Sequence, residues 1–138
     1  ALELVLAPEL KRADAARAIK IAGLACAVLG DGLRKAAQVT AGTSFTHLIQ
    51  TTKRPEHKLI THGVYRYIRH PGYFGWFVWC VGTQALLCNP IAAIGFAVAA
   101  ARFFQKRVPF EEARLNAMFP GEYAAYAART RTWLPGIP

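Results

Sequence analysis

Residues 71–101 read PGYFGWFVWCVGTQALLCNPIAAIGFAVAAA, a run of 31 residues without Asp, Glu, Lys, Arg or His. As one helix the run would be roughly 46 Å long, whereas a membrane span needs about 20 apolar residues to cross a hydrocarbon core of about 30 Å. Asn89-Pro90 interrupts the run, and proline disfavours helix at the residue before it and removes a backbone donor. The run therefore predicts a hairpin of two helices, about 73–88 and 91–104, joined by a tight turn.

Basic side chains gather on both flanks of this hairpin. Because a hairpin returns its two ends to the same side, the excess of Lys and Arg predicts that this side faces the cytosol. The basic residues are Lys53, Arg54, Lys58, Arg66 and Arg69 before the run, and Arg102, Lys106 and Arg107 after it. The alternative is a helical hairpin buried in the core of a soluble protein.

The composition of the whole chain favours the membrane interpretation. The chain has 138 residues, a net charge of +9, 54% hydrophobic residues and only 18% charged residues. The apolar content excludes intrinsic disorder, and a nucleic-acid-binding domain of this charge would be richer in charged residues. A mean hydropathy of +0.20 in so small a protein indicates that part of its surface faces lipid. The three cysteines form neither a disulfide framework nor a zinc-binding spacing.

A second apolar stretch, residues 19–33, continues through an alanine-rich run to residue 41 and predicts a long helix. Asp31 precedes Arg34 and Lys35 by three and four residues, which predicts either an ion pair within that helix or a position of Asp31 at the membrane interface.

The remaining segments predict shorter elements. The polar segment 42–61 predicts a loop, and VYRYIRH at residues 64–70 resumes helical spacing. Pro109 predicts the start of a further helix, because proline suits the first helical position. Pro120-Gly121 predicts its end, followed by a last amphipathic helix at residues 121–129.

Several common catalytic arrangements are missing from the sequence. Gly30-Asp31-Gly32 is followed by Leu-Arg-Lys and follows no predicted strand, so neither a phosphate-binding loop nor a Rossmann site is expected. Ser44 is the only serine, which disfavours a Ser/His/Asp triad, and the four histidines lack a zinc-binding pattern. We therefore expect no metal site.

Two clusters of polar residues flank the hairpin. The first, HKLITHGVYRYIRHPGYFG at residues 57–75, ends where Pro71 forces the chain out of helical hydrogen bonding. The second, RFFQKRVPFEEARL at residues 102–115, holds Arg107 and Glu111 at a spacing that allows an ion pair. The hairpin brings both clusters together, so cations and a carboxylate converge on one rim of the membrane. The alternative is that these side chains only anchor the hairpin at the lipid headgroups.

Three long segments resemble the isoprenylcysteine carboxyl methyltransferase family, and in particular its eukaryotic members. They are GDGLRKAAQVTAGTSFTHLIQ, HKLITHGVYRYIRHPGYFGWFVWCVGTQALLCNPI and RFFQKRVPFEEARLNAMFPGEYAAYAARTRTWLPGI. The match keeps the spacing of an HxLxTxGVYxxxRHPxYxG block, an LLCNPI turn and an EE…GEYxxY tail. The RHPxYxG fragment alone is less specific, because membrane sterol reductases and phospholipid methyltransferases resemble it there.

The resemblance implies an all-α, polytopic integral membrane protein with a helical hairpin at about 73–104 and a cofactor pocket on its cytosolic face. Residues 1–138 would form a single membrane methyltransferase domain, without the N-terminal spanning helices of the familiar members. The implied protein resides in the endoplasmic reticulum and uses S-adenosylmethionine to methylate the α-carboxylate of the prenylated cysteine of processed C-a-a-X proteins. It binds the lipid bilayer and neither nucleic acid nor metal.

The resemblance also carries site residues onto this sequence by position. It implies that Arg107 contacts the substrate and is the catalytic residue. The implied S-adenosylmethionine contacts are Gln50, His57, Lys58, Leu59, Ile60, Tyr65, His70, Pro71, Gly72, Tyr73 and Glu111. Tyr123, Tyr126 and Arg129 match the tail pattern and are further candidates for the pocket lining. Three other functions stay open: an NADPH-dependent enzyme of the sterol-reductase type, a phospholipid methyltransferase, and a catalytically silent membrane subunit.

Overall fold

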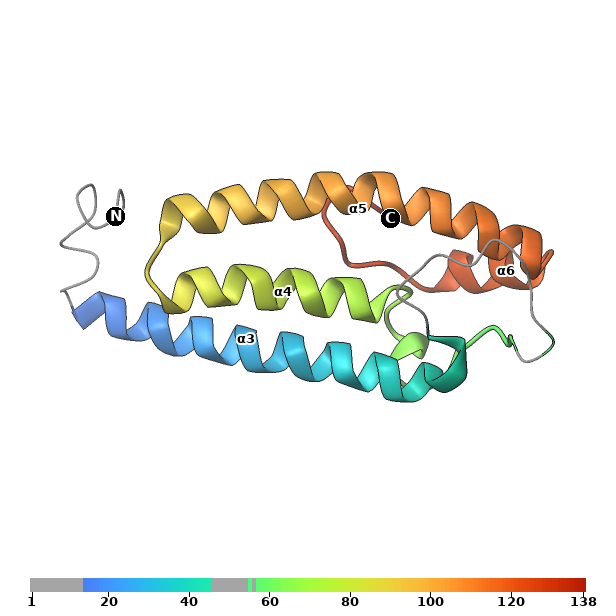
Figure 1. Cartoon of the computed structure of the whole chain (residues 1–138), viewed down its shortest axis with the longest axis horizontal. Coiled ribbons are helices and arrows are strands. Elements are labelled where there is room, and N and C mark those ends of the chain that lie inside the picture. The colour runs from blue at the N-terminus through green and yellow to red at the C-terminus, as the bar shows by residue number, and fades with distance from the viewer. Residues whose placement is uncertain (1–13, 46–54, 56) are drawn as a thin grey trace.

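A computed structural model describes residues 14–45, 55 and 57–138 of the chain, and within these residues all regular structure is helical. Three long helices run side by side, and a short fourth helix packs near one end of the third (Figure 1). The α-helices are α3 (Asp14–Ala41), α4 (Pro71–Leu86), α5 (Pro90–Met118) and α6 (Glu122–Arg129), and the 3-10 turns are η1 (Gly42–Ser44) and η2 (Gly63–Arg66). The predicted all-α class and the long helix ending at residue 41 are confirmed.

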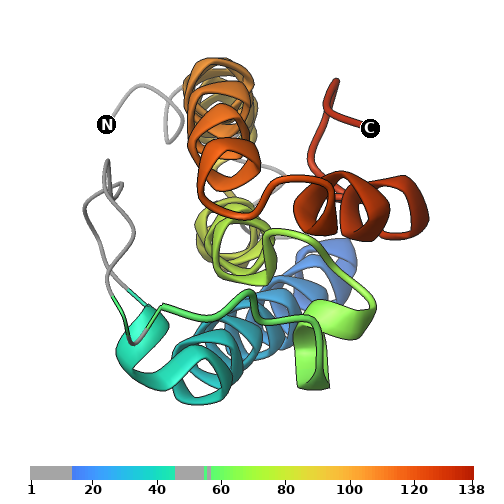
Figure 2. The same cartoon turned by 90° about the vertical axis from the view of Figure 1, so that its right-hand side faces the viewer.

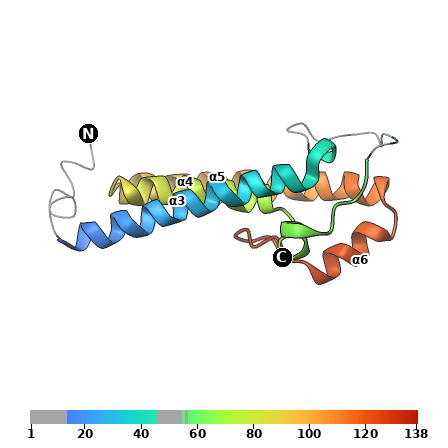
Figure 3. The same cartoon turned by 90° about the horizontal axis from the view of Figure 1, so that it is seen from below.

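Helix α4 lies between α3 and α5, as the view along the bundle shows (Figure 2). The contact of α4 with α3 is a contact between backbones, because glycines face each other across it. A Cβ on Gly30 would lie 2.5 Å from Trp79 N and 2.6 Å from Gly75 O, closer than real Cβ atoms approach any atom. We call the four glycines Gly23, Gly30, Gly75 and Gly82 the glycine contact. Seen from below, α3 crosses the α4–α5 pair at a shallow angle (Figure 3).

The apolar run forms two helices that are joined through Leu87, Cys88 and Asn89, as the Asn89-Pro90 signal predicts. Pro71 and Pro90 each occupy the first turn of their helix, where a missing N–H costs no hydrogen bond. Helix α4 ends two residues earlier than predicted. Among the described residues, none of the helices combines the length and the apolar character that a membrane crossing requires.

The prediction that Pro109 starts a new helix is wrong, because α5 runs on through Pro109 to Met118. Proline inside a helix removes one hydrogen bond and crowds the carbonyl four residues before it. Packing outweighs this cost, because Val108 is fully buried on one side of Pro109 and Phe104 is buried one turn earlier.

The C-terminal segment after α6 folds back against α5 and closes the core. The Thr132 hydroxyl donates to Ile137 O at 2.6 Å and accepts from Leu134 N at 3.2 Å, which shapes the segment into a tight turn. Leu134 thereby joins the buried cluster formed by Ala100, Phe104 and Val108. The same cluster packs against Tyr73 and Trp76 of α4, so the C-terminal turn supports the region where the two polar clusters meet.

Candidate functional site

The segment that enters α4 is mostly irregular. Only Gly63–Arg66 forms a helical turn, so the prediction of continuous helical spacing through residues 64–70 is wrong. Pro71 contributes to this at the last position, because proline disfavours the α region for the residue before it. His70 accordingly has φ −126° and ψ 64°, and both His70 and Arg69 turn inward and are buried.

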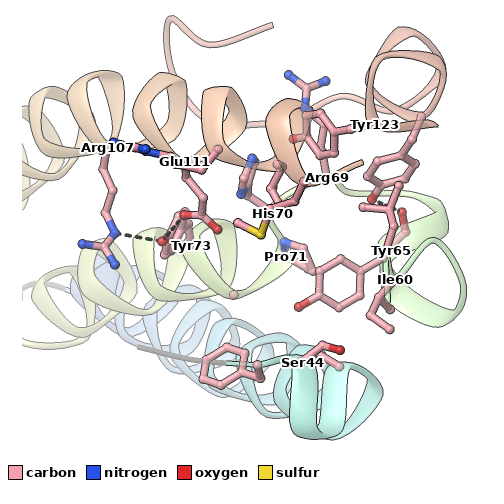
Figure 4. Close-up of a pocket in the computed structure, with 18 of the residues that line it drawn as sticks. Ser44, Ile60, Tyr65, Arg69, His70, Pro71, Tyr73, Arg107, Glu111 and Tyr123 are labelled. Carbon is pink, nitrogen blue, oxygen red and sulfur yellow. Dashed lines mark hydrogen bonds between the residues drawn. The ribbon is translucent and has the colours of Figure 1, made fainter. Parts of the chain in front are cut away.

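A cavity of about 350 Å³ lies where this segment meets α5, α6 and the end of α3 (Figure 4). This volume falls within the range typical of small-molecule sites, about 300–1,000 Å³. Most of its lining is apolar or aromatic, and the polar groups come chiefly from the 57–73 segment and from α5.

The cavity brings together most of the residues that the resemblance implies. His57, Leu59, Ile60, Tyr65, His70, Pro71, Gly72, Tyr73, Arg107 and Glu111 all line it, as do Tyr123 and Tyr126. Lys58 is exposed, and the Arg129 guanidinium lies 6.0 Å from the centre of the Tyr126 ring. Gln50, Lys53 and Arg54 lie outside the described residues.

The Tyr73 hydroxyl links two charged residues of the second cluster, Arg107 and Glu111. It donates to Glu111 Oε2 at 2.5 Å and accepts from Arg107 Nε at 2.8 Å (Figure 4). The Arg107 guanidinium also lies 5.6 Å from the centre of the Tyr73 ring. A cation and a carboxylate are thus fixed one turn apart on α5, both at the cavity wall.

The neighbouring carboxylate, Glu112, faces a different set of groups. Its Oε1 atom accepts from Arg69 Nε at 2.6 Å, from His70 Nε2 at 2.9 Å and from the Tyr123 hydroxyl at 3.0 Å. Burial alone would raise the pKa of Glu112, but the hydrogen bonds and charges of His70 and Arg69 outweigh it and lower this pKa from 4.5 to about 2. Glu112 is therefore ionised at neutral pH.

Arg69 joins this carboxylate to the C-terminal part of the chain. Its Nη1 donates to Ala127 O at 3.1 Å and to Thr130 O, and its backbone N–H donates to Arg131 O at 2.8 Å. Its Nη2 donates to Pro138 O at 2.8 Å. Only 8% of Arg69 is exposed, so its charge is balanced by Glu112 and solvated by these carbonyl groups in place of water.

Two tyrosines complete the wall on the side of α3 and α6. Tyr65 donates to Ala37 O at 3.4 Å, and Tyr126 donates to Tyr65 O at 2.6 Å. Burial, followed by the nearby charge of Glu111, raises the pKa of Tyr65 to about 12, so this hydroxyl stays protonated.

Other lining residues are absent from the sequence-based set. They are Arg34, Ala41, Ser44, Phe45, Arg69, Trp76, Phe103, Phe104, Arg114, Leu115, Met118 and Phe119. Those on α5 fall on one helical face with Arg107 and Glu111, and helical spacing would have found them if Pro109 had not suggested a break. Within the part of the chain that the structure describes, no group of three His, Cys, Asp or Glu side chains is placed to hold a metal ion.

Comparison with known proteins identifies the family of this chain. A solved structure titled as the eukaryotic intramembrane Ras methyltransferase ICMT superposes with a TM-score of 0.91 at 40% sequence identity, over 99% of this chain and 48% of that one. The chain thus has the fold of a helical methyltransferase of membranes. Residues 23–117 match the isoprenylcysteine carboxyl methyltransferase family, and the chain belongs to that family.

Curated relatives extend the match to nearly the whole chain. A probable protein-S-isoprenylcysteine O-methyltransferase of Oryza sativa subsp. indica is 47% identical over 98% of this chain and 69% of its own length. The protein-S-isoprenylcysteine O-methyltransferase of Homo sapiens is 45% identical over 99% of this chain. The chain spans 47% of the human relative, about half its length.

Proposed function

We propose that this chain transfers the methyl group of S-adenosylmethionine to the α-carboxylate of a C-terminal prenylated cysteine. The observation that carries the proposal is the Arg107–Tyr73–Glu111 group, which holds a cation and a carboxylate at the wall of one cavity. The names of the relatives indicate the reaction, and the cation and carboxylate at the cavity wall suit its charged reactants.

The residues present fit the proposed methyl donor. S-Adenosylmethionine carries a sulfonium, an ammonium and a carboxylate, and supplies a methyl group activated for displacement. Glu111 would hold a positive group of the donor, while the aromatic lining from Tyr65, Trp76 and Phe104 would cover its base. Carried-over contacts at Leu59, Ile60 and Gly72 lie around the same cavity.

The acceptor needs no general base. An α-carboxyl group has a pKa of about 3.5 and is ionised at neutral pH, so the oxygen that attacks the methyl carbon is already a nucleophile. One C–O bond forms as the sulfonium C–S bond breaks, and no proton moves. Arg107 would orient the carboxylate, and the hydrogen bond of its Nε to Tyr73 fixes the guanidinium. The protein's contribution is to align the two reactants and to exclude water.

The outer faces of the bundle suit an enzyme whose acceptor is held in lipid. Large apolar side chains are exposed on α3, among them Val28 and Leu29 at 62% and 70%, and on α5, where Ile94 is 66% exposed. Apolar surface of this extent is typical of a membrane-facing or partner-covered surface. We place the protein in the endoplasmic reticulum membrane with its cavity open to the cytosol, where the methyl donor and processed C-a-a-X proteins meet.

The test is methyl transfer by membranes that contain the protein. With labelled S-adenosylmethionine and N-acetyl-S-farnesylcysteine, we expect a base-labile methyl ester. Arg107→Ala and Glu111→Ala should each lower kcat/KM by about 10-fold to 100-fold, the range for loss of a charge-assisted hydrogen bond.

Arg102→Ala is the matched control, because Arg102 is an exposed arginine on the same helix, and it should leave activity unchanged. Failure of correctly inserted protein to transfer label would contradict the proposed function and favour a silent subunit or a different enzyme of similar fold. Full activity in both site variants would contradict the residue assignment alone.

A further inference from the structure

Glu112 lies beside the proposed site and has no role in the proposed chemistry. Its Oε1 atom accepts hydrogen bonds from two segments that are far apart in sequence, the 69–70 pair and α6, which thereby meet α5 at this one atom. Its side chain is 20% exposed, and those of Arg69 and His70 are 7% and 6% exposed. Three donors to one oxygen in so enclosed a place fix its position closely.

The bond from His70 determines the state of the imidazole ring. An ionised carboxylate only accepts hydrogen bonds, so His70 Nε2, 2.9 Å from Glu112 Oε1, carries a proton. The ring then stacks on Tyr73, with 5.5 Å between centroids and 4° between planes. Glu112 thus holds a proton on Nε2 and fixes the plane of a ring that lines the cavity.

Tyr73 connects the His70 ring to the two charged residues Arg107 and Glu111. Its hydroxyl bonds Arg107 and Glu111, and its ring packs between His70 and Phe104, whose centroid is 4.9 Å away. A rotation of the His70 ring would therefore leave Tyr73 without support on one side. The two adjacent glutamates have separate tasks: Glu111 faces the cavity, and Glu112 holds the wall behind it.

We infer that Glu112 is a positioning residue that acts through His70, which it orients for binding the methyl donor. Arg69 holds Glu112 in turn and ties it to the carbonyls of Ala127 and Thr130. The inference rests on the proposed function for the identity of the ligand, whereas the link between Glu112 and His70 stands on geometry alone.

The first measurement is ligand binding without turnover. The dissociation constant of S-adenosylhomocysteine, measured by titration calorimetry on the purified full chain, should rise about tenfold in Glu112→Ala. It should rise only about threefold in Glu112→Gln, because the amide oxygen still accepts from His70 Nε2. Glu122→Ala, the same change at an exposed carboxylate of α6, should change it less than twofold. If Glu112→Ala does not fold, Glu112→Gln alone carries the test.

A double-mutant cycle separates positioning from general support of the fold. In the His70→Ala background, either change at Glu112 should alter the dissociation constant less than twofold, because the ring through which Glu112 acts is gone. An undiminished effect in that background would overturn the inference. So would an unchanged dissociation constant in Glu112→Gln and Glu112→Ala with His70 present.

The ¹⁵N spectrum of labelled histidines gives a readout that needs no ligand. The signal that disappears in His70→Ala should show a protonated Nε2 in the parent protein, and that proton should no longer be fixed on Nε2 in Glu112→Ala. A His70 signal that Glu112→Ala leaves unchanged would overturn the inference. If the parent protein binds no S-adenosylhomocysteine but the His70 signal responds to Glu112, the proposed function fails while the positioning link holds.

Discussion

The α3–α4 contact and the junction of α5 with α6 hold this protein together by opposite chemistry. At the glycine contact two backbones touch each other directly. At the junction, Glu112, Arg69, His70 and Tyr123 form a network of charged hydrogen bonds. The first contact is sensitive to any added atom, and the second is sensitive to the loss of a charge. The two regions should therefore respond to different substitutions and, in the second region alone, to pH.

The largest effect is expected where an atom is added to the glycine contact. In Gly30→Ala the new methyl group would lie 2.5 Å from Trp79 N, so the helices must separate and the free energy of unfolding should fall by about 3 kcal/mol. Gly32→Ala is the matched control two residues away on α3, where a Cβ meets nothing within 4 Å. There the better helix propensity of alanine should raise stability by about 0.5–1 kcal/mol.

Melting temperatures of the two variants test this contrast directly. Shifts of opposite sign in the two melting temperatures would confirm that the glycine contact, and not helix propensity, controls the effect at Gly30. Equal shifts in both variants would show that α3 and α4 can separate at little cost.

A smaller effect is expected at the junction, and it should depend on pH. The pKa of Glu112 is lowered from 4.5 to about 2 in the folded protein, so its ionised form is favoured there. This contribution is complete above about pH 4.5 and is lost as the pH falls from 4.5 towards 2. Glu112→Gln should therefore cost about 2 kcal/mol near neutral pH, the scale of a hydrogen bond to a charged group.

Thermal unfolding of Glu112→Gln and of the parent protein at several pH values measures this difference. The difference in the free energy of unfolding between the variant and the parent protein should be constant above about pH 5 and should become smaller below pH 4.5. A gap that stays the same down to pH 3 would contradict the assignment of the lowered pKa to Glu112.

The smallest effect is expected at an ion pair that belongs to neither region. Lys35 Nζ lies 2.5 Å from Asp31 Oδ2, and the two residues are one helical turn apart on α3. The side chains of Asp31 and Lys35 are 43% and 69% exposed. Exposed pairs of this kind contribute about 0.3–0.5 kcal/mol, so Asp31→Asn should barely change the melting temperature at low salt and not at all at high salt. A loss above 1 kcal/mol would show that Asp31 has a further role.

Local signals in the sequence predicted most of the fold. The uncharged run and Asn89-Pro90 located α4 and the start of α5, and the pairing within α3 followed from residue spacing. Pro109 misled the prediction, because the cost of a proline within a helix is local, whereas the burial of Val108 that outweighs it depends on the whole fold.

Less of the candidate site than of the fold could be predicted from the sequence. The family resemblance named Arg107 and Glu111, and the structure places both at one cavity. It assigned no role to Glu112, and nothing in the local sequence sets this glutamate apart from Glu111. Their difference arises from Arg69 and Tyr123, which reach Glu112 across 43 and 11 residues of chain. No spacing rule connects such distant residues.

The contacts of Arg69 have a consequence for the order in which the cavity wall forms during synthesis. Its guanidinium needs carbonyl partners at residues 127 and 130, which are 58 and 61 positions later in the chain. While a ribosome is still translating α5, neither α6 nor the segment after it exists to bind the Arg69 side chain. The contacts of Arg69 with Ala127 and Thr130 therefore join residues of high sequence separation. The helices can pack as they emerge, but the cavity wall is finished only after residues 127–131 have left the ribosome, and the core that supports it only after Leu134 has followed.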